Sequence, residues 1–278
     1  MKKGLFLWVC FLFFISSNLF ALSRKSLNER IKLAENLIDY FTSSPDRKIP
    51  AELFERADAI IFMKQYKGGF VLGGKGGNGI VIAKDRKTGE WSPPAFVANA
   101  EGSFGFQIGG QVIEAILLIM NKEGLDMLLK SRIKIGVDLS AAAGPYGREA
   151  GGKVGPGTGI LIYSKAKGLY AGASIEGGVL VPDEKANEIF YGKGIKIRDI
   201  LIRRTVKMPE EGKKLIEKLE NYLRTEEEVI KKEKESKVKK EEGNKEEEEE
   251  KEKEKEKNKK SKKNESDKEI IKKIIEEK

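Results

Sequence analysis

The stretch that decides the fold reads Lys67-Gly-Gly-Phe-Val-Leu-Gly-Gly-Lys-Gly-Gly-Asn-Gly79-Ile-Val-Ile82. Two related stretches follow it, Trp91-Ser-Pro-Pro94 and Gly102-Ser-Phe-Gly-Phe-Gln-Ile-Gly-Gly110. Short β-branched and aromatic runs between glycines predict strands that approach one another closely and turn sharply. With helical patterns on either side, the chain is predicted to be α+β. We expect a strongly bent, antiparallel, glycine-rich sheet or partial barrel, with N-terminal and C-terminal helices and a charged tail.

The N-terminal end has the composition of a leader. Residues 1–21 start with two lysines after the methionine, continue with an apolar run over 4–15 and end with an alanine. The run is too short for a comfortable membrane span, so the pattern is typical of a secretory signal peptide. An uncleaved anchor is the alternative, and lipidation at Cys10 is disfavoured because Val9 is large. We therefore expect an exported protein that is periplasmic or associated with a surface or membrane.

The rest of the chain divides by composition into three parts. Residues 22–206 form the expected globular domain, and 207–224 continue it as a C-terminal helix. Residues 225–278 are almost pure Lys and Glu and are low in complexity. This tail lacks the apolar surface needed to offset chain entropy, so we expect a fluctuating helix or coil that could reach a protein partner.

The net charge is concentrated in the globular part. Residues 207–278 carry 24 basic and 24 acidic residues, so none of the formal +9 comes from them. Removal of the leader still leaves the domain about +7. A cationic domain favours anionic partners such as a membrane surface or polyphosphate. Nucleic acid is disfavoured, because an exported protein seldom meets it and aromatics are not interleaved with the basic residues.

Patterns for catalysis and cofactor binding are weak. The chain has no histidine, and its one cysteine lies in the leader. Residues 74–79 match G-x-G-x-x-G, but the strand-forming run 80–82 follows where a dinucleotide site needs a helix. A P-loop over 69–75 would lack the Ser or Thr that binds magnesium. Ser164-Lys165 and Asp138 carry no further mark of a catalytic role. We expect no enzyme activity, no metal and no cofactor.

The first helix admits two interpretations. Ser26-Leu-Asn-Glu29 is a capping-box pattern, and apolar residues follow it at helical spacing. The helix either packs on the core or lies on a membrane as a basic amphipathic helix that inserts Leu27, Ile31 and Phe41. The basic residues clustered at its start are Arg24, Lys25, Arg30 and Lys32.

Further elements are expected from local patterns. Periodicity alone does not assign the long apolar run 112–120. Helices are predicted over 50–59, 124–131 and 182–190 and from 209 onward, and strands over 60–63, 69–72, 80–83, 96–99, 104–108, 134–143, 159–163, 169–175 and 178–181.

Basic residues beside glycine turns are the candidate binding residues. Each alone is typical of a solvated surface charge. Gathered on one face, they would attract phosphate groups, each contributing about 1 kcal/mol at an anionic membrane. They are Lys64, Lys67, Lys75, Arg148, Lys153, Lys165 and Lys167.

Ten short motifs follow one another in a recognisable order and spacing. They are Ile49-Pro50, Lys67-x-Gly69-Phe70, Gly76-Gly-x-Gly79, Trp91-Ser-x-Pro94, Gln107-Ile-Gly109, Gly144-Pro-x-Gly-Arg148, Tyr163-Ser-Lys165, Gly168-Leu169-x-Ala-Gly172, Glu176-Gly177 and Tyr191-Gly192. In them the chain resembles the SYLF family, lipid-binding domains of yeast and animal actin-patch proteins and of many bacterial exported proteins. The resemblance covers about residues 26–206, outside the leader and the tail.

The resemblance implies binding of acidic phospholipids, phosphoinositides in the eukaryotic members, through an N-terminal amphipathic helix and basic surface residues. It places Lys67 and Lys75 at basic positions of the first hairpin, Lys165 and Lys167 at a basic pair, and Arg148 at a motif arginine. Position 75 is arginine-type in the family, and a lysine there keeps the charge but loses bidentate phosphate geometry. Actin-associated partners are not expected, because the sequence shows no companion SH3 or lipid-sensing zinc-finger domain.

Three functional hypotheses result. The first is reversible, non-catalytic binding of anionic phospholipid. The second is a structural or scaffold protein of the envelope that acts through its charged tail. The third is an enzyme, which would require turnover that is lost on mutation of Lys165.

Overall fold

The computed structural model describes residues 22–69, 72–104, 109–144, 157–168 and 178–236. The chain separates into two compact units, residues 1–223 and 224–278, and the described part of the second, 224–236, is helical. No helix among the described residues combines the length and apolarity that a membrane span needs.

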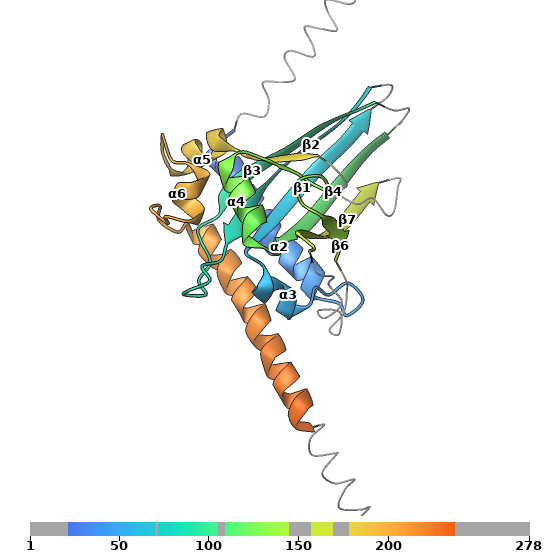
Figure 1. Ribbon diagram of the computed structural model, residues 1–278, viewed down its shortest axis with the longest axis vertical. Coiled ribbons are helices and arrows are strands. Elements are labelled where there is room, and N and C mark those ends of the chain that lie inside the picture. Colours follow the sequence, from blue (N-terminus) through green and yellow to red (C-terminus); the bar gives the residue numbers. More distant parts are fainter. Residues whose placement is uncertain (1–21, 70–71, 105–108, 145–156, 169–177, 237–278) are drawn as a thin grey trace, which may run out of the picture. The chain divides into compact units, whose positions relative to one another are not determined.

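The first unit is α+β, as predicted (Figure 1). Its helices are α2 (Arg24–Thr42), α3 (Ala51–Arg56), α4 (Lys122–Lys130), α5 (Glu184–Tyr191) and α6 (Ile197–Leu201), followed by a helix that begins at residue 210. Its strands are β1 (Ala59–Gly69), β2 (Leu72–Ala83), β3 (Ala95–Phe104), β4 (Gly109–Ile119), β5 (Ile133–Lys134), β6 (Ala141–Ala143), β7 (Ile160–Gly168) and β8 (Val179–Pro182).

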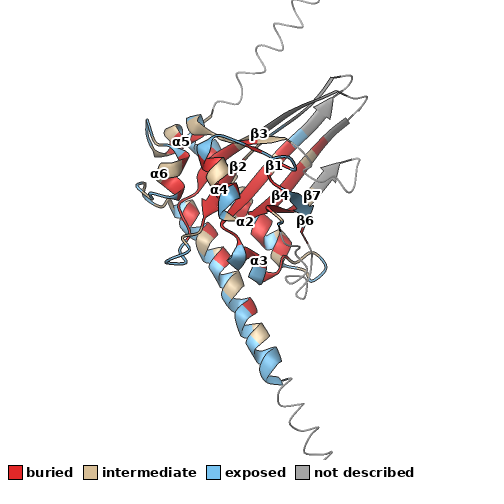
Figure 2. Ribbon diagram, viewed as in Figure 1, coloured by how far each residue is buried: buried red, intermediate tan, exposed pale blue. Residues whose placement is uncertain are grey.

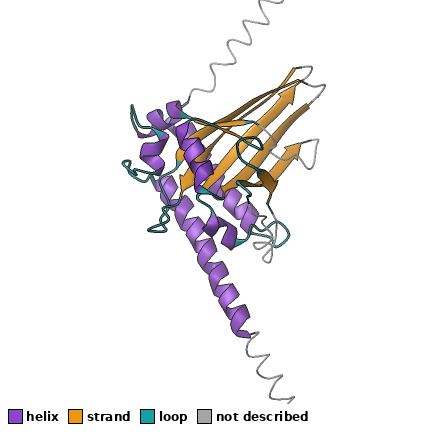
Figure 3. Cartoon of the chain, in the orientation of Figure 1, coloured by secondary structure: helices purple, strands orange, loops and turns teal. Residues whose placement is uncertain are grey.

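The strands form one strongly curled, half-barrel sheet in the order β5-β8-β3-β2-β1-β4-β7-β6 (Figure 3). Neighbours pair antiparallel, except that β6 and β7 are parallel. The four long strands β1 to β4 pair without interruption over the described residues, for example Ala59 with Ala83 and Gly69 with Gly109. The predicted bent antiparallel sheet is therefore confirmed, with one parallel pair at its edge.

Side chains alternate between two hydrophobic cores, one on each face of the sheet. Ile60, Phe62 and Tyr163 face a core with α2, α3 and Leu215 and Leu219 of the helix that follows residue 210. On the opposite face, Ile61 and Met63 contact a core with α4 and α6. Figure 2 shows buried residues filling the strand halves that lie among the helices. We call these the first face and the second face of the sheet.

Glycine lies inside the strands, whereas the sequence pattern placed it between them. The predicted short strands 60–63 and 80–83 are the ends of the long strands β1 and β2. A Cβ added to Gly79 would lie only 2.0 Å from the backbone oxygen of Phe62 on β1, and one added to Gly77 only 2.7 Å from that of Lys64. The curled backbones approach too closely for a side chain, so glycine here permits pairing rather than ending it.

Several boundaries differ from prediction. α2 begins at Arg24, because Ser23 is its N-cap and forms the capping box with Ser26, one turn before the predicted box. The unassigned run 112–120 is strand β4, and 134–143 contains two short strands rather than one. Residues 169–175 and 105–108 lie outside the described residues.

Candidate functional site

Helix α2 packs on the first face of the sheet. Leu27 and Ile31 are 0% exposed and Phe41 is 1% exposed, all three within the core of that face. The packed interpretation of this helix is therefore the one the structure shows. The expectation that these three residues insert into a membrane is corrected, because the sheet already removes their apolar surface from water.

Two of the arginines near the start of α2 connect it to α5. Arg24 donates a hydrogen bond of 2.8 Å to the carbonyl of Phe190 and lies over its ring. Arg30 pairs with Asp183 at 2.9 Å, and Asp183 also accepts from the backbone N–H of Ala186 as the N-cap of α5. These predicted lipid-binding residues therefore hold helices together. Lys25 and Lys32 are exposed, and Lys32 pairs with Glu29 at 3.3 Å.

The strand register divides the predicted basic residues between the two faces. Lys67 and Lys75 are directly paired across β1 and β2, at positions in phase with Met63 on the second face. Lys165 and Lys167 of β7 are in phase with Tyr163 on the first face. The single cationic face expected from the sequence is thus not formed by these positions. Arg148 and Lys153 lie outside the described residues.

All four of these lysine positions lie at one end of the sheet, which we call the distal end. It comprises 64–69 of β1, 72–78 of β2, 98–104 of β3, 109–114 of β4 and 165–168 of β7, joined by continuous register. Figure 1 shows the long strands projecting beyond the helices at this end. The register therefore gathers these positions at an end of the sheet instead of on a face.

A charged cluster on the first face marks the border between core and distal end. The Lys64 Nζ and Lys165 Nζ atoms lie 3.8 and 3.5 Å from the two carboxylate oxygens of Glu114. Lys165 also lies over the Tyr40 ring of α2, 4.1 Å from its centroid. The cluster contains two ammonium groups and one carboxylate, so these three side chains together carry a formal charge of +1. The Glu114 side chain is only 10% exposed, so water screens the cluster less than it screens a surface charge.

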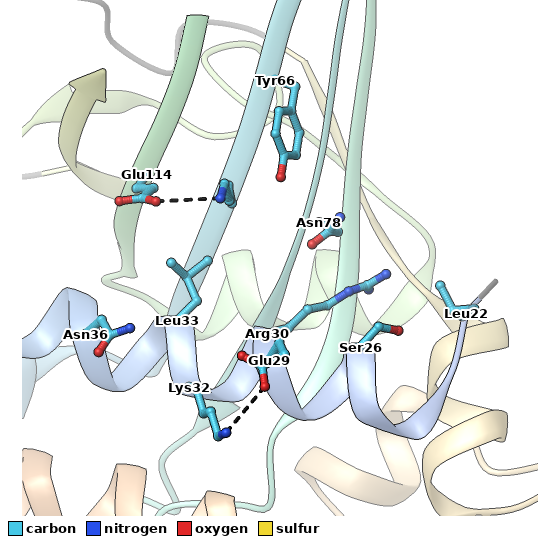
Figure 4. Close-up of a pocket in the computed structure, with 11 residues that line it drawn as sticks. Leu22, Ser26, Glu29, Arg30, Lys32, Leu33, Asn36, Tyr66, Asn78 and Glu114 are labelled. Atoms are coloured by element: carbon cyan, nitrogen blue, oxygen red, sulfur yellow. Dashed lines mark hydrogen bonds and ion pairs between the residues drawn. The ribbon is translucent and has the colours of Figure 1, made fainter. Parts of the chain in front are cut away.

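A groove of about 920 Å³ lies between α2 and the first face, next to this cluster (Figure 4). From α2 it is lined by residues that include Arg30 and Leu33, and from the strands by Lys64, Tyr66, Asn78 and Glu114. In Figure 4 Leu33 points from α2 towards the strands. The ion pair between Lys64 and Glu114 links β1 to β4 beside it. On β1 the core position Phe62 is followed on the same face by Lys64 and Tyr66, which line the groove.

Sequence reasoning missed Tyr66, Asn78 and Glu114. A signal for them existed in the period-two pattern of β1, where Lys64 and Tyr66 continue the phase of Ile60 and Phe62. The register that brings Asn78 and Glu114 beside Lys64 is a property of the folded sheet. Among the described residues, no group of three acidic, histidine or cysteine side chains could hold a metal ion.

Comparison with known proteins identifies the family. The family model described as "Ysc84: Las17-binding protein actin regulator" matches residues 100–222. Human SH3 domain-containing YSC84-like protein 1 is 30% identical over 205 residues, which cover 71% of this chain and 59% of the human protein. The chain belongs to the Ysc84 (SYLF) family.

Two yeast proteins are also similar to this chain. Protein YSC84 of Saccharomyces cerevisiae is 30% identical over 207 residues, covering 71% of this chain and 44% of the yeast protein. LAS seventeen-binding protein 3 of the same species is 29% identical over 187 residues, covering 64% of this chain and 40% of that protein. The chain spans less than two thirds of each of these relatives. The family model and LAS seventeen-binding protein 3 are named for binding, which fits a non-enzyme.

Proposed function

We propose that this SYLF domain is a non-catalytic module that binds anionic phospholipid surfaces through the distal end of its half-barrel. The lipid partner is the one expected from the sequence, but the element that binds it is the distal end of the sheet and not the first helix. Helix α2 is committed to the core, so the basic end of the sheet takes the role that the sequence analysis gave to an inserted helix and a basic face.

The observation that carries the proposal is the direct pairing of Lys67 with Lys75. Like charges directly opposite each other on neighbouring strands destabilise a sheet. Next in that row are Gln111 beside Lys67 and Glu101 beside Lys75, so one carboxylate position accompanies two lysine positions. A bound anion would offset the repulsion expected between the two lysines. Because this pairing does not favour folding, we infer that it serves to bind an anion.

The charge of the whole distal end supports the same partner. Its strand segments contain five lysines, at 64, 67, 75, 165 and 167, and two glutamates, at 101 and 114. Cationic side chains near an anionic membrane contribute about 1 kcal/mol each, and this attraction is screened within about 8 Å at physiological salt. The proposed contact is therefore electrostatic, reversible and sensitive to salt.

Removal of the central lysine pair tests the proposal. We expect Lys67→Ala/Lys75→Ala to weaken partition of the full chain onto vesicles of mixed phosphatidylserine and phosphatidylcholine by roughly 30-fold, since two contacts of about 1 kcal/mol are lost. Co-sedimentation at several salt concentrations measures the effect. The matched control is Lys185→Ala/Lys193→Ala, which removes the same charge from exposed positions in and after α5.

Two outcomes would contradict this function. Equal partition of the unmodified chain onto phosphatidylcholine and mixed vesicles would remove the electrostatic basis. An equal loss for both double variants would show that net charge, rather than the distal end, governs binding.

A protein partner is the second candidate. The matching family model carries the description "Las17-binding protein", and a relative is named for the same interaction. For this chain, we propose the Lys/Glu-rich residues 225–278 as the contact and an exported location as its setting. A chain that lacks these residues would then keep its vesicle binding and lose its location in the cell.

A further inference from the structure

The groove along α2 has an apolar strip beside a polar one. Leu22, Leu33 and Tyr66 supply the apolar surface, and the Tyr66 side chain is 51% exposed. Lys64 and Asn78, which are cross-strand partners on β1 and β2, supply hydrogen-bond donors beside it. The volume of about 920 Å³ lies within the range of small-molecule sites, roughly 300–1,000 Å³. This combination matches a molecule with one charged end and one apolar end.

The charge of the groove selects an anion. Glu114 is shared between Lys64 and Lys165, so this corner of the groove carries one more positive than negative charge. The Lys64 side chain is 33% exposed and lines the groove, so it is available to a ligand there. The other cations of the lining are already paired, Arg30 with Asp183 and Lys32 with Glu29. The excess charge therefore resides at Lys64 and Lys165.

The backbone that lines the groove is unsuited to an extended peptide. Strands β1, β2 and β4 are interior strands, each paired on both sides, so they present no free edge for an added strand. The remaining wall is helix α2, whose backbone groups bond within the helix. A ligand must bind through side chains, by one charge contact and apolar packing, as a lipid does.

We propose that this groove binds a single molecule of an anionic phospholipid, with its phosphate at Lys64 and Asn78 and an acyl chain along Leu33 and Tyr66. The inference rests on the proposed function and deepens it, since the domain would hold one lipid molecule as well as adsorb to a surface. The groove lies on the first face, whereas the Lys67–Lys75 pair belongs to the second. The two contacts are therefore separable by mutation.

Gly76 provides a way to fill the groove without disturbing the fold. It is the cross-strand partner of Tyr66 and lies two residues from Asn78 on the same strand face. A Cβ added at Gly76 meets no atom within 4 Å. The indole of Gly76→Trp should therefore fill the space beside Tyr66. Tyr66→Ala tests the same place in the opposite way, because it removes apolar contact surface instead of adding a side chain.

The experiment titrates the full chain by calorimetry with dioctanoyl phosphatidic acid below its micelle concentration. Dioctanoyl phosphatidylcholine and inorganic phosphate are the comparison probes. We expect saturable one-to-one binding of the anionic lipid, at least about tenfold weaker binding of both comparison probes, and a loss of about tenfold or more in Gly76→Trp and in Tyr66→Ala. Lys185→Ala/Lys193→Ala, exposed positions in and after α5, should bind the monomeric lipid as the unmodified chain does.

The outcomes separate this inference from the proposed function. Vesicle binding without saturable binding of monomeric lipid overturns the groove inference and leaves the proposed function intact. Phosphate binding as tight as that of the lipid overturns the acyl-chain contact, and unchanged lipid binding in both folded groove variants overturns the location. Absence of binding to both vesicles and monomeric lipid overturns the function and the inference together.

Discussion

Ile31→Asp is expected to prevent stable folding of the domain in the absence of any lipid. Ile31 is 0% exposed in the core between α2 and the first face of the sheet. The change removes about 1.5–3 kcal/mol of apolar burial and places a carboxylate where it has no water. We expect a loss of at least about 4 kcal/mol, a large fraction of the 5–15 kcal/mol that stabilises a typical domain. Urea unfolding followed by circular dichroism measures it.

Lys32→Ala is the matched control on the next residue of the same helix. Its side chain is 55% exposed and forms a surface ion pair with Glu29. The free energy of unfolding should change by no more than about 0.5 kcal/mol. If Ile31→Asp unfolded at the same urea concentration as the unmodified chain, the apolar face of α2 would be outside the core, and the membrane-inserted interpretation would return.

Gly79→Ala is expected to destabilise the sheet by about 3 kcal/mol or more. The added Cβ would lie 2.0 Å from the Phe62 oxygen and 2.9 Å from the Met63 Cα, both backbone atoms of the paired strand. Backbone atoms in an interior strand have no rotamer by which to move away, so β1 and β2 must separate. Thermal unfolding of the full chain measures the loss as a lower melting temperature.

Gly76→Ala, three residues earlier in the same strand, is the control for this change. The same methyl group meets nothing within 4 Å there. It should be neutral or stabilising by roughly 0.5–1 kcal/mol, because alanine loses less conformational freedom than glycine on folding. Equal destabilisation by both changes would mean that glycine is needed for flexibility, and that close strand approach is not the reason for Gly79.

The sequence predicted the fold class better than the extent of its elements. Glycine-rich apolar runs indicated a bent antiparallel sheet, and the spacing of Leu27, Ile31 and Phe41 indicated the helix that packs on it. The glycines were placed between strands rather than inside them, because a local pattern does not show how closely the partner strand approaches. A Cβ added at Gly79 would lie 2.0 Å from a backbone atom of β1, whereas one added at Gly76 meets no atom within 4 Å. Strand β4 was left unassigned because a run buried on both faces has no period.

The candidate site was harder to predict than the fold. Lysines 64, 67, 75, 165 and 167 were recognised as candidates from their positions beside glycine turns. Their division between faces follows from register, since a shift of one residue exchanges the faces. Glu114 and Asn78 became part of a site only because β4 and β2 pair on either side of β1.

The sequence by itself determined a cationic α+β domain of the SYLF family, with a packed or membrane-bound first helix and a charged tail beyond it. Composition and periodicity suffice for the charge, the fold class, the first helix and the tail, because these depend on residue types and local spacing. The family was indicated by the resemblance in ten short motifs. Only the tertiary structure decided that α2 is buried, that the lysines share an end of the sheet and that a groove lies beside α2. These depend on which strands are neighbours and in which register, and contacts between residues distant in sequence set both.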